Sequence, residues 1–170
     1  MTTGDKIEYL QEKILKEESQ KNFNAVIALS HEILGLLGDG NSHLRTAAFQ
    51  WDLVARMHLH LNEFVKAEMA AKKSLETYLH YRKEVGGNWT PERDSYFADF
   101  RMTMALSLAY QKRYAEAMPY AEQWEQTHLK VRGPDDPFVK DVVVRHMKRM
   151  RARLAGLPVS ENDWNEHAAK

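Results

Sequence analysis

Apolar residues recur at helical spacing along almost the whole chain. Near its start, Ile7, Leu10, Ile14 and Leu15 follow the i, i+3, i+7 and i+8 positions of one helix face. No stretch alternates apolar and polar residues as a half-buried strand does, so we expect no sheet. The pattern predicts an all-α protein with seven main helices. Their expected ranges are about 5–20, 23–37, 42–61, 65–85, 91–112, 114–131 and 138–155.

Capping and helix-breaking residues separate these segments. Asp5, with Glu8 three residues later, is expected to cap the first helix, and Ser42 the third. Thr90-Pro91 and Asp136-Pro137 each place a capping residue before a proline, which indicates a new helix. Further breaks are expected at 21–22, 38–41, 86–88 and 133–135, and at Gly156 with Pro158. Ser160 and Asp163 are expected to cap a short last turn that holds Trp164.

A short pattern occurs three times between paired helices. An aromatic residue is followed three positions later by a small or medium apolar residue; the copies are Phe23 with Val26, Phe64 with Ala67, and Tyr114 with Ala117. Ala55 and Ala105 each precede the next ring by nine residues. We expect each ring to wedge between two antiparallel helices, which approach closely at the alanines. The rings are 41 and 50 residues apart, so we expect residues 86–91 to form a longer loop than the other inter-repeat turns.

This unit resembles the tetratricopeptide repeat (TPR) family. The resemblance rests on Ala55, Phe64, Ala67, Ala105, Tyr114 and Ala117. The last unit is also similar to the longer repeats of kinesin light chains, through Tyr114, Ala117, Pro119 and residues 133–137. The glycine usual in the turn is replaced by Asn62 and Lys112. The resemblance implies a TPR-like α-α superhelix of about three helix pairs plus a C-terminal capping helix.

We therefore expect a single domain, 1–170, with units at about 5–40, 42–88 and 90–134, a capping helix at about 137–155 and a tail at 156–170. The capping helix has one apolar stripe, formed by Val143, Met147, Met150 and Leu154. Cations occupy much of its remaining surface: Lys140, Arg145, Lys148, Arg149, Arg151 and Arg153. This basic face is interpreted as a solvated surface, with a docking surface for an acidic partner as the alternative.

Composition narrows the class of protein. Lys and Arg number 24 and so do Asp and Glu, a balance that argues against a nucleic-acid binder. The absence of cysteine excludes disulfides, thiolate nucleophiles and cysteine-based metal sites. The first residues lack the charged and apolar regions of a signal peptide, and the apolar runs are shorter than the ~20 residues of a membrane span. We expect a cytoplasmic protein.

Candidate chemistry is sparse, so we expect no enzyme, cofactor or metal site. The glycine-rich phosphate loops and the nucleophile elbow are missing from the sequence. Glu76, His80 and Glu84 share a helix face but lack a second histidine. Glu125 and His128 match one Glu-x-x-His element of di-iron bundles, which need a second copy. Trp51 and Trp124 are expected to pack within helices, whereas Trp89 and Trp164 staple loops or contact a partner.

The resemblance implies a non-enzymatic protein–protein interaction module that binds a peptide or helical segment of a partner in a concave groove. The groove would be lined by Gln11, Asp52, Arg56, Leu59, His60, Met102, Leu106 and Tyr110. Members that clamp a chaperone tail carry lysine where this chain has Asp52 and Met102, and asparagine where it has Arg56 and Leu106. We therefore expect an apolar or amphipathic partner segment. The alternative is a scaffold protein that self-associates, for example as a homodimer, through its terminal helices.

Overall fold

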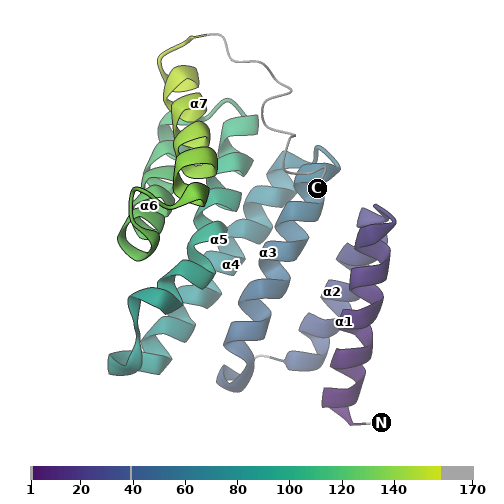
Figure 1. Ribbon diagram of the computed structural model, residues 1–170. Helices are drawn as coiled ribbons and strands as arrows, with labels where there is room; N and C mark the ends of the chain where they lie inside the picture. The colour runs from purple at the N-terminus through teal and green to yellow at the C-terminus, as the bar shows by residue number, and fades with distance from the viewer. Residues whose placement is uncertain (1, 39, 158–170) are drawn as a thin grey trace. The chain divides into compact units, whose positions relative to one another are not determined.

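The computed structural model describes residues 2–38 and 40–157 (Figure 1). Within these residues the regular elements are helices and no strand occurs, which confirms the all-α prediction. The α-helices are α1 (Thr3–Ser19), α2 (Phe23–Leu37), α3 (Leu44–His60), α4 (Phe64–Val85), α5 (Pro91–Tyr110), α6 (Tyr114–Arg132) and α7 (Val144–Leu154). Two 3₁₀ helices, η1 (Asn41–His43) and η2 (Gly86–Asn88), and a π-helical segment, η3 (Val139–Val143), connect them. No helix in this part of the chain is long and apolar enough to cross a bilayer.

The chain divides into two compact units by its packing. The first unit, Met1–Trp89, contains α1 to α4, and the second begins at Thr90 and contains α5, α6 and α7. The single domain and the superhelical stacking of all the pairs stay predictions.

In the first unit each helix packs on the next, α1 on α2, α2 on α3 and α3 on α4 (Figure 1). The core of α1 to α3 is apolar and consists of Leu10, Ile14, Val26, Ile33, Leu37, Leu53 and Met57. Leu15 was expected to join this core, but it is 67% exposed. Leu10 and Ile14 already face α2, and the next residue turns about 100° away from them. Between α3 and α4, the buried Ser74 hydroxyl donates a hydrogen bond to the Ala48 carbonyl at 2.9 Å.

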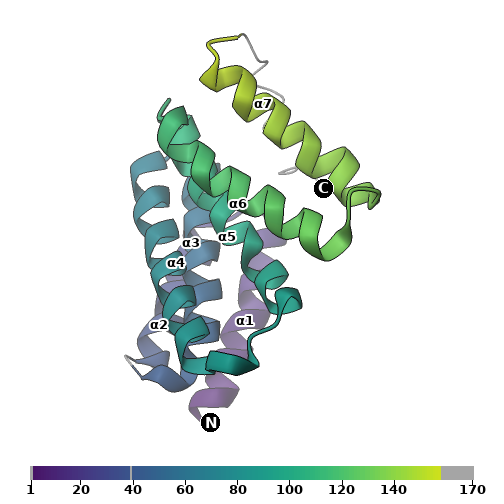
Figure 2. The same cartoon turned by 90° about the vertical axis from the view of Figure 1, so that its left-hand side faces the viewer.

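In the second unit α5 packs on α6, and α6 on α7 and η3 (Figure 2). Val143, Met147 and Met150 are fully buried, as the apolar stripe predicts, but Leu154 is 47% exposed. Leu154 is the last residue of α7, so less of the neighbouring helix covers it. Tyr96 is exposed, because the adjacent Phe97 occupies the buried face of α5.

The alanines of the repeat pattern are buried within the helix pairs. Ala55, Ala67, Ala105 and Ala117 are all 0% exposed. Ala55 and Ala67 lie on the tightly packed pair α3 and α4, and Ala105 and Ala117 on α5 and α6. Val26, the corresponding residue of the weaker first copy, is also fully buried. The three copies therefore share one packing role.

The turn within each helix pair has the same backbone geometry. Lys21, Asn62 and Lys112, each two residues before the ring, adopt positive φ values of 57°, 58° and 63°. The following amide donates to a carbonyl five residues earlier: Asn22 to Glu17 at 2.9 Å, Glu63 to His58 at 2.9 Å and Arg113 to Leu108 at 3.0 Å. This bond and the left-handed residue define the Schellman motif that ends a helix. The three turns are thus structural copies of one another.

Two of the capping residues predicted from the sequence are confirmed, and two are wrong. Thr90 accepts a hydrogen bond from the Arg93 amide, and Asp136 accepts from the Phe138 and Val139 amides, as the capping-proline pairs predict. The cap of α1 is Thr2 rather than Asp5, and Asp5 is its capping-box partner. Ser42 does not cap α3, because it lies within η1 and α3 begins at Leu44.

The longer spacing of the last repeat has a different origin from the one expected. The segment between α4 and α5 is residues 86–90, which is shorter than the segment 38–43 between α2 and α3. The prediction of a longer loop is therefore wrong, and the extra residues lie in the helices. α4 has 22 residues against 15 in α2, and α5 has 20 against 17 in α3.

The segment that follows α4 packs on that helix through aromatic rings. Trp89 contacts Tyr78 and Tyr81 edge-to-face, each with ring centroids 5.7 Å apart. The Arg82 guanidinium lies 5.7 Å from the centre of the Trp89 ring. Trp89 therefore staples the loop that follows α4. The expected cap residues Ser160 and Asp163, with Trp164 and Pro158, lie outside the described residues.

Candidate partner-binding surface

The first-unit part of the expected groove centres on an arginine held by a buried carboxylate. Asp52 is only 4% exposed, although it was expected to line an open groove. Its Oδ2 accepts a hydrogen bond from Arg56 Nε at 3.0 Å, one helical turn along α3. The Arg56 side chain is 48% exposed. Because the bond to Asp52 uses Nε, the terminal Nη groups of Arg56 remain available for a second carboxylate or a carbonyl.

The next turn of α3 adds an aromatic and an aliphatic side chain. The His60 ring stacks on Phe23 with centroids 4.6 Å apart and an interplanar angle of 11°. Burial lowers the pKa of His60 below its usual value, and the nearby charge of Arg56 lowers it further. Leu59 is partly buried. Since the neutral imidazole is favoured, this end of α3 offers a flat, weakly polar surface beside Arg56.

The remaining first-unit residue, Gln11, is exposed on α1. Lys6 on the same helix forms an ion pair with Glu32 of α2 at 3.0 Å. Asp52, Arg56, Leu59 and His60 all lie on α3, so the structure brings these four together by helical spacing.

The second-unit part of the expected groove lies on α5. Met102 is buried, at 7% exposure, whereas Leu106 and Tyr110 are partly exposed. The three residues follow i, i+4 and i+8 spacing and therefore share one helix face. Burial raises the pKa of the Tyr110 hydroxyl. The accessible part of this face is the end that carries Leu106 and Tyr110.

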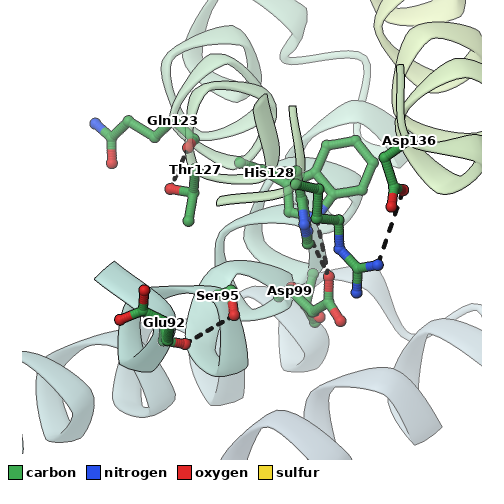
Figure 3. A network of polar contacts seen from close by, with 10 residues as sticks. Glu92, Ser95, Asp99, Gln123, Thr127, His128 and Asp136 are labelled. Atoms are coloured by element: carbon green, nitrogen blue, oxygen red, sulfur yellow. Dashed lines mark hydrogen bonds and ion pairs between the residues drawn. The ribbon is translucent and has the colours of Figure 1, made fainter. Parts of the chain in front are cut away.

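A cluster in the second unit, in which two buried rings meet the exposed carboxylate of Asp99, was not expected from the sequence (Figure 3). Trp124 Nε1 donates a hydrogen bond to Asp99 Oδ1 at 2.9 Å, and His128 Nε2 lies 3.6 Å from the same oxygen. Trp124 and His128 are only 2% and 3% exposed. The rings of Phe138 and His146 contact them at centroid distances of 5.0 to 6.4 Å. The cluster joins α5, α6 and the segments that lead into and form α7.

Neither of the two carboxylate–histidine patterns found in the sequence forms a metal site among the described residues. Glu125 accepts a hydrogen bond from Arg151 of α7 at 2.7 Å, whereas His128 lies in the aromatic cluster. His80 Nε2 lies 3.7 Å from Glu84 on the exposed surface of α4. Among residues 2–38 and 40–157, no group of three acidic or histidine side chains is placed to hold a metal ion.

The sequence indicates only part of this cluster. Trp124 and His128 are four residues apart, so helical spacing alone places them on one face. Asp99 precedes Trp124 by 25 residues on another helix, and only the tertiary pairing of α5 with α6 brings it near.

No protein-family model matches the chain, and no curated protein matches it.

Proposed function

We propose that this protein is a non-enzymatic protein–protein interaction module with TPR-like helix pairs, and that it binds a peptide or helical segment of a partner. The binding side chains are those on the first helices of the second and third pairs, α3 and α5. The repeated Schellman turns and fully buried alanines support the repeat relationship, because one geometry recurs at all three within-pair turns.

The observation that carries the proposal is the Asp52–Arg56 pair. A carboxylate that is 4% exposed is unfavourable unless a cation or hydrogen-bond donors compensate it. Here the Asp52 carboxylate fixes one edge of the Arg56 guanidinium, and the Arg56 side chain is 48% exposed. An arginine oriented in advance loses less conformational entropy on binding, so it suits recognition of a carboxylate or carbonyl group.

Partner binding is tested by co-purification from the native cell with the wild-type chain and with Arg56→Ala and Tyr110→Ala. We expect the wild type to retain a partner that both variants lose in part. Lys72→Ala is the matched control, because Lys72 is exposed on α4, the second helix of its pair. Equal recovery of the partner with all four proteins would contradict binding through α3 and α5.

A second candidate is self-association through the terminal helices. Tyr9 and Leu15 of α1 are 51% and 67% exposed, which leaves apolar surface uncovered on that helix. Light scattering during size-exclusion chromatography distinguishes the two functions. A mass that rises with concentration, and falls in a Tyr9→Glu/Leu15→Glu variant, would favour the scaffold.

A further inference from the structure

The helix α4 carries more exposed large apolar side chains than any other helix in the part of the chain that the structure describes. Val65 and Met69 are each 62% exposed, and Leu79 is 55% exposed. They share one side of the helix with three exposed charged residues, because all six follow one another at steps of three or four. We call this set the α4 stripe, and its members are Val65, Met69, Lys72, Glu76, Leu79 and Lys83.

The α4 stripe lies opposite the buried side of the helix. The buried side consists of Ala67, Ala70, Ala71, Ser74 and Tyr78. The Ser74 hydroxyl donates a hydrogen bond to α3. With about 100° per residue, every member of the α4 stripe lies within about 40° of Val65, whereas Ser74 lies about 180° away. The packing of α4 on α3 therefore does not require apolar side chains on the stripe.

The two central charges of the α4 stripe have no partner within residues 2–38 and 40–157. Lys72 and Glu76 are exposed and one turn apart, yet they form no ion pair with each other or with another described side chain. A lysine that precedes a glutamate by four residues is the less favourable order for a pair within one helix. Both charges are therefore available to a second molecule.

The α4 stripe is complementary to itself. Its pairs symmetric about residue 74 are Lys72 with Glu76, Met69 with Leu79, and Val65 with Lys83. When two copies of one helix lie antiparallel about a twofold axis, each residue faces the residue at the same distance beyond the axis in the second copy. An axis at residue 74 therefore matches lysine with glutamate and methionine with leucine in one register. Residue 74 is near the middle of Phe64–Val85, so the two helices overlap along about 30 Å.

We propose that the α4 stripe is a homodimer interface, in which α4 of a second copy of this chain packs antiparallel about a twofold axis at residue 74. Two symmetric ion pairs between Lys72 and Glu76 of the second copy fix the register and the direction of the helices. A parallel pair would place lysine against lysine and glutamate against glutamate, so like charges oppose it.

Apolar contacts on both sides of the ion pairs provide the buried area. Met69 meets Leu79 of the second copy, and the aliphatic stem of Lys83 covers Val65. One helix from each chain gives an interface at the small end of the range for specific complexes, so we expect a weak dimer. The interface uses none of the side chains assigned to partner binding on α3 and α5, and none of α1.

Sedimentation equilibrium of the full chain tests the apolar contacts. We expect the wild-type mass to rise with concentration between about 1 μM and about 1 mM and to approach that of two chains. Met69→Glu/Leu79→Glu should weaken association at least about tenfold, because it places carboxylates in the apolar contacts. Tyr9→Glu/Leu15→Glu introduces the same charges at exposed apolar positions of α1 and should change association less than about twofold.

Charge exchange tests the register with chains whose own fold does not change on mixing. Lys72→Glu and Glu76→Lys should each weaken association at least about fivefold, because each puts like charges across the twofold axis. An equimolar mixture of the two variants has opposite charges across the axis in the mixed dimer. The mixture should therefore associate within about threefold of the wild type. Circular dichroism of each variant checks that it is folded.

Four results would overturn the proposal. The first is a wild-type mass of one chain throughout the range; loss of a co-purified partner in Met69→Glu/Leu79→Glu would then assign the stripe to a different protein. The second is a mass that grows beyond two chains, since this interface closes at a dimer. The third is association that Tyr9→Glu/Leu15→Glu abolishes and Met69→Glu/Leu79→Glu does not, which would place self-association on α1. The fourth is no gain in association when Lys72→Glu and Glu76→Lys are mixed.

Discussion

At the scale of single residues, the most informative positions are those where the backbone tolerates few side chains. Lys21 and Lys112 have positive φ, a conformation that is unfavourable for any residue with a Cβ atom and that asparagine tolerates better. The corresponding Asn62 is therefore under less strain than the two lysines. The chain retains lysine at two of three turns where glycine fits best, so stability can be gained there.

Lys112→Gly should raise the free energy of unfolding by about 0.5–1 kcal/mol, because glycine adopts a φ of 63° without strain. Urea denaturation measures the change. Lys112→Ala is the control, since it removes the same side chain but keeps the Cβ atom. Stabilisation by alanine as large as that by glycine would show that the lysine side chain, rather than the backbone, causes the effect.

The buried alanines give a second prediction at this scale. Ala117→Leu should destabilise the protein by about 1–3 kcal/mol, because extra methylene groups must enter a site with 0% exposure between α5 and α6. Ala115→Leu, two residues earlier in the same helix, is exposed and should change stability by less than about 0.5 kcal/mol. Equal melting temperatures of the two variants would contradict the repeat register.

At the scale of helices, the sequence predicts most of the architecture, and its misses have local causes. Helical spacing located all seven α-helices, because their apolar faces pack within a unit. Helical spacing misplaced Leu15, since the adjacent Ile14 already fills the buried face. It could not locate η3, because a π-helical turn has no period of its own in the apolar pattern. It assigned the wider repeat spacing to a loop, although longer helices account for it.

The same limits apply to the candidate surface. Spacing from Ala55 and Ala105 placed Arg56 and Tyr110 on accessible parts of α3 and α5. It could not show that Asp52 and Met102 are buried, because their exposure depends on side chains from other helices. The Asp99–Trp124–His128 cluster has the same origin, since it exists only once α5 and α6 are paired.

The packing of α2 on α3 predicts a pH dependence of stability. The pKa of His60 is lowered in the folded chain, chiefly by burial, so the unfolded chain takes up a proton more readily near pH 6.5. The contribution of His60 to the free energy of unfolding is therefore fully present above about pH 6.5. It is lost as the pH falls from the unfolded-state pKa through the lower folded-state pKa.

His60→Phe keeps an aromatic ring against Phe23 and removes the titrating group. We expect the urea midpoint of this variant to fall less between about pH 7 and about pH 5 than that of the wild type. Part of the dependence should persist, because the pKa of His31 is also lowered by burial. An unchanged pH profile in His60→Phe would show that the His60 environment does not contribute to acid destabilisation.

At the scale of the whole molecule, the described residues form two helical units, which carry two candidate partner-binding surfaces. The exposed side chains of α3 and α5 carry the proposed function, and the basic face of α7 is the alternative docking surface. The two surfaces differ in chemistry, since Arg56 lies beside aromatic and aliphatic groups whereas α7 presents several cations. Their contributions to binding should therefore respond differently to salt.

The most direct test of the central claim is the dissociation constant of the co-purified partner for four forms of the full chain. These are the wild type, Arg56→Ala, Tyr110→Ala and Arg145→Glu/Lys148→Glu. Binding through α3 and α5 predicts that Arg56→Ala and Tyr110→Ala each weaken the affinity by about 1–2 kcal/mol, or roughly 5- to 30-fold, without unfolding the protein. Unchanged affinity in both of these variants, with loss of binding in the α7 variant, would contradict the claim and place the principal binding surface on α7.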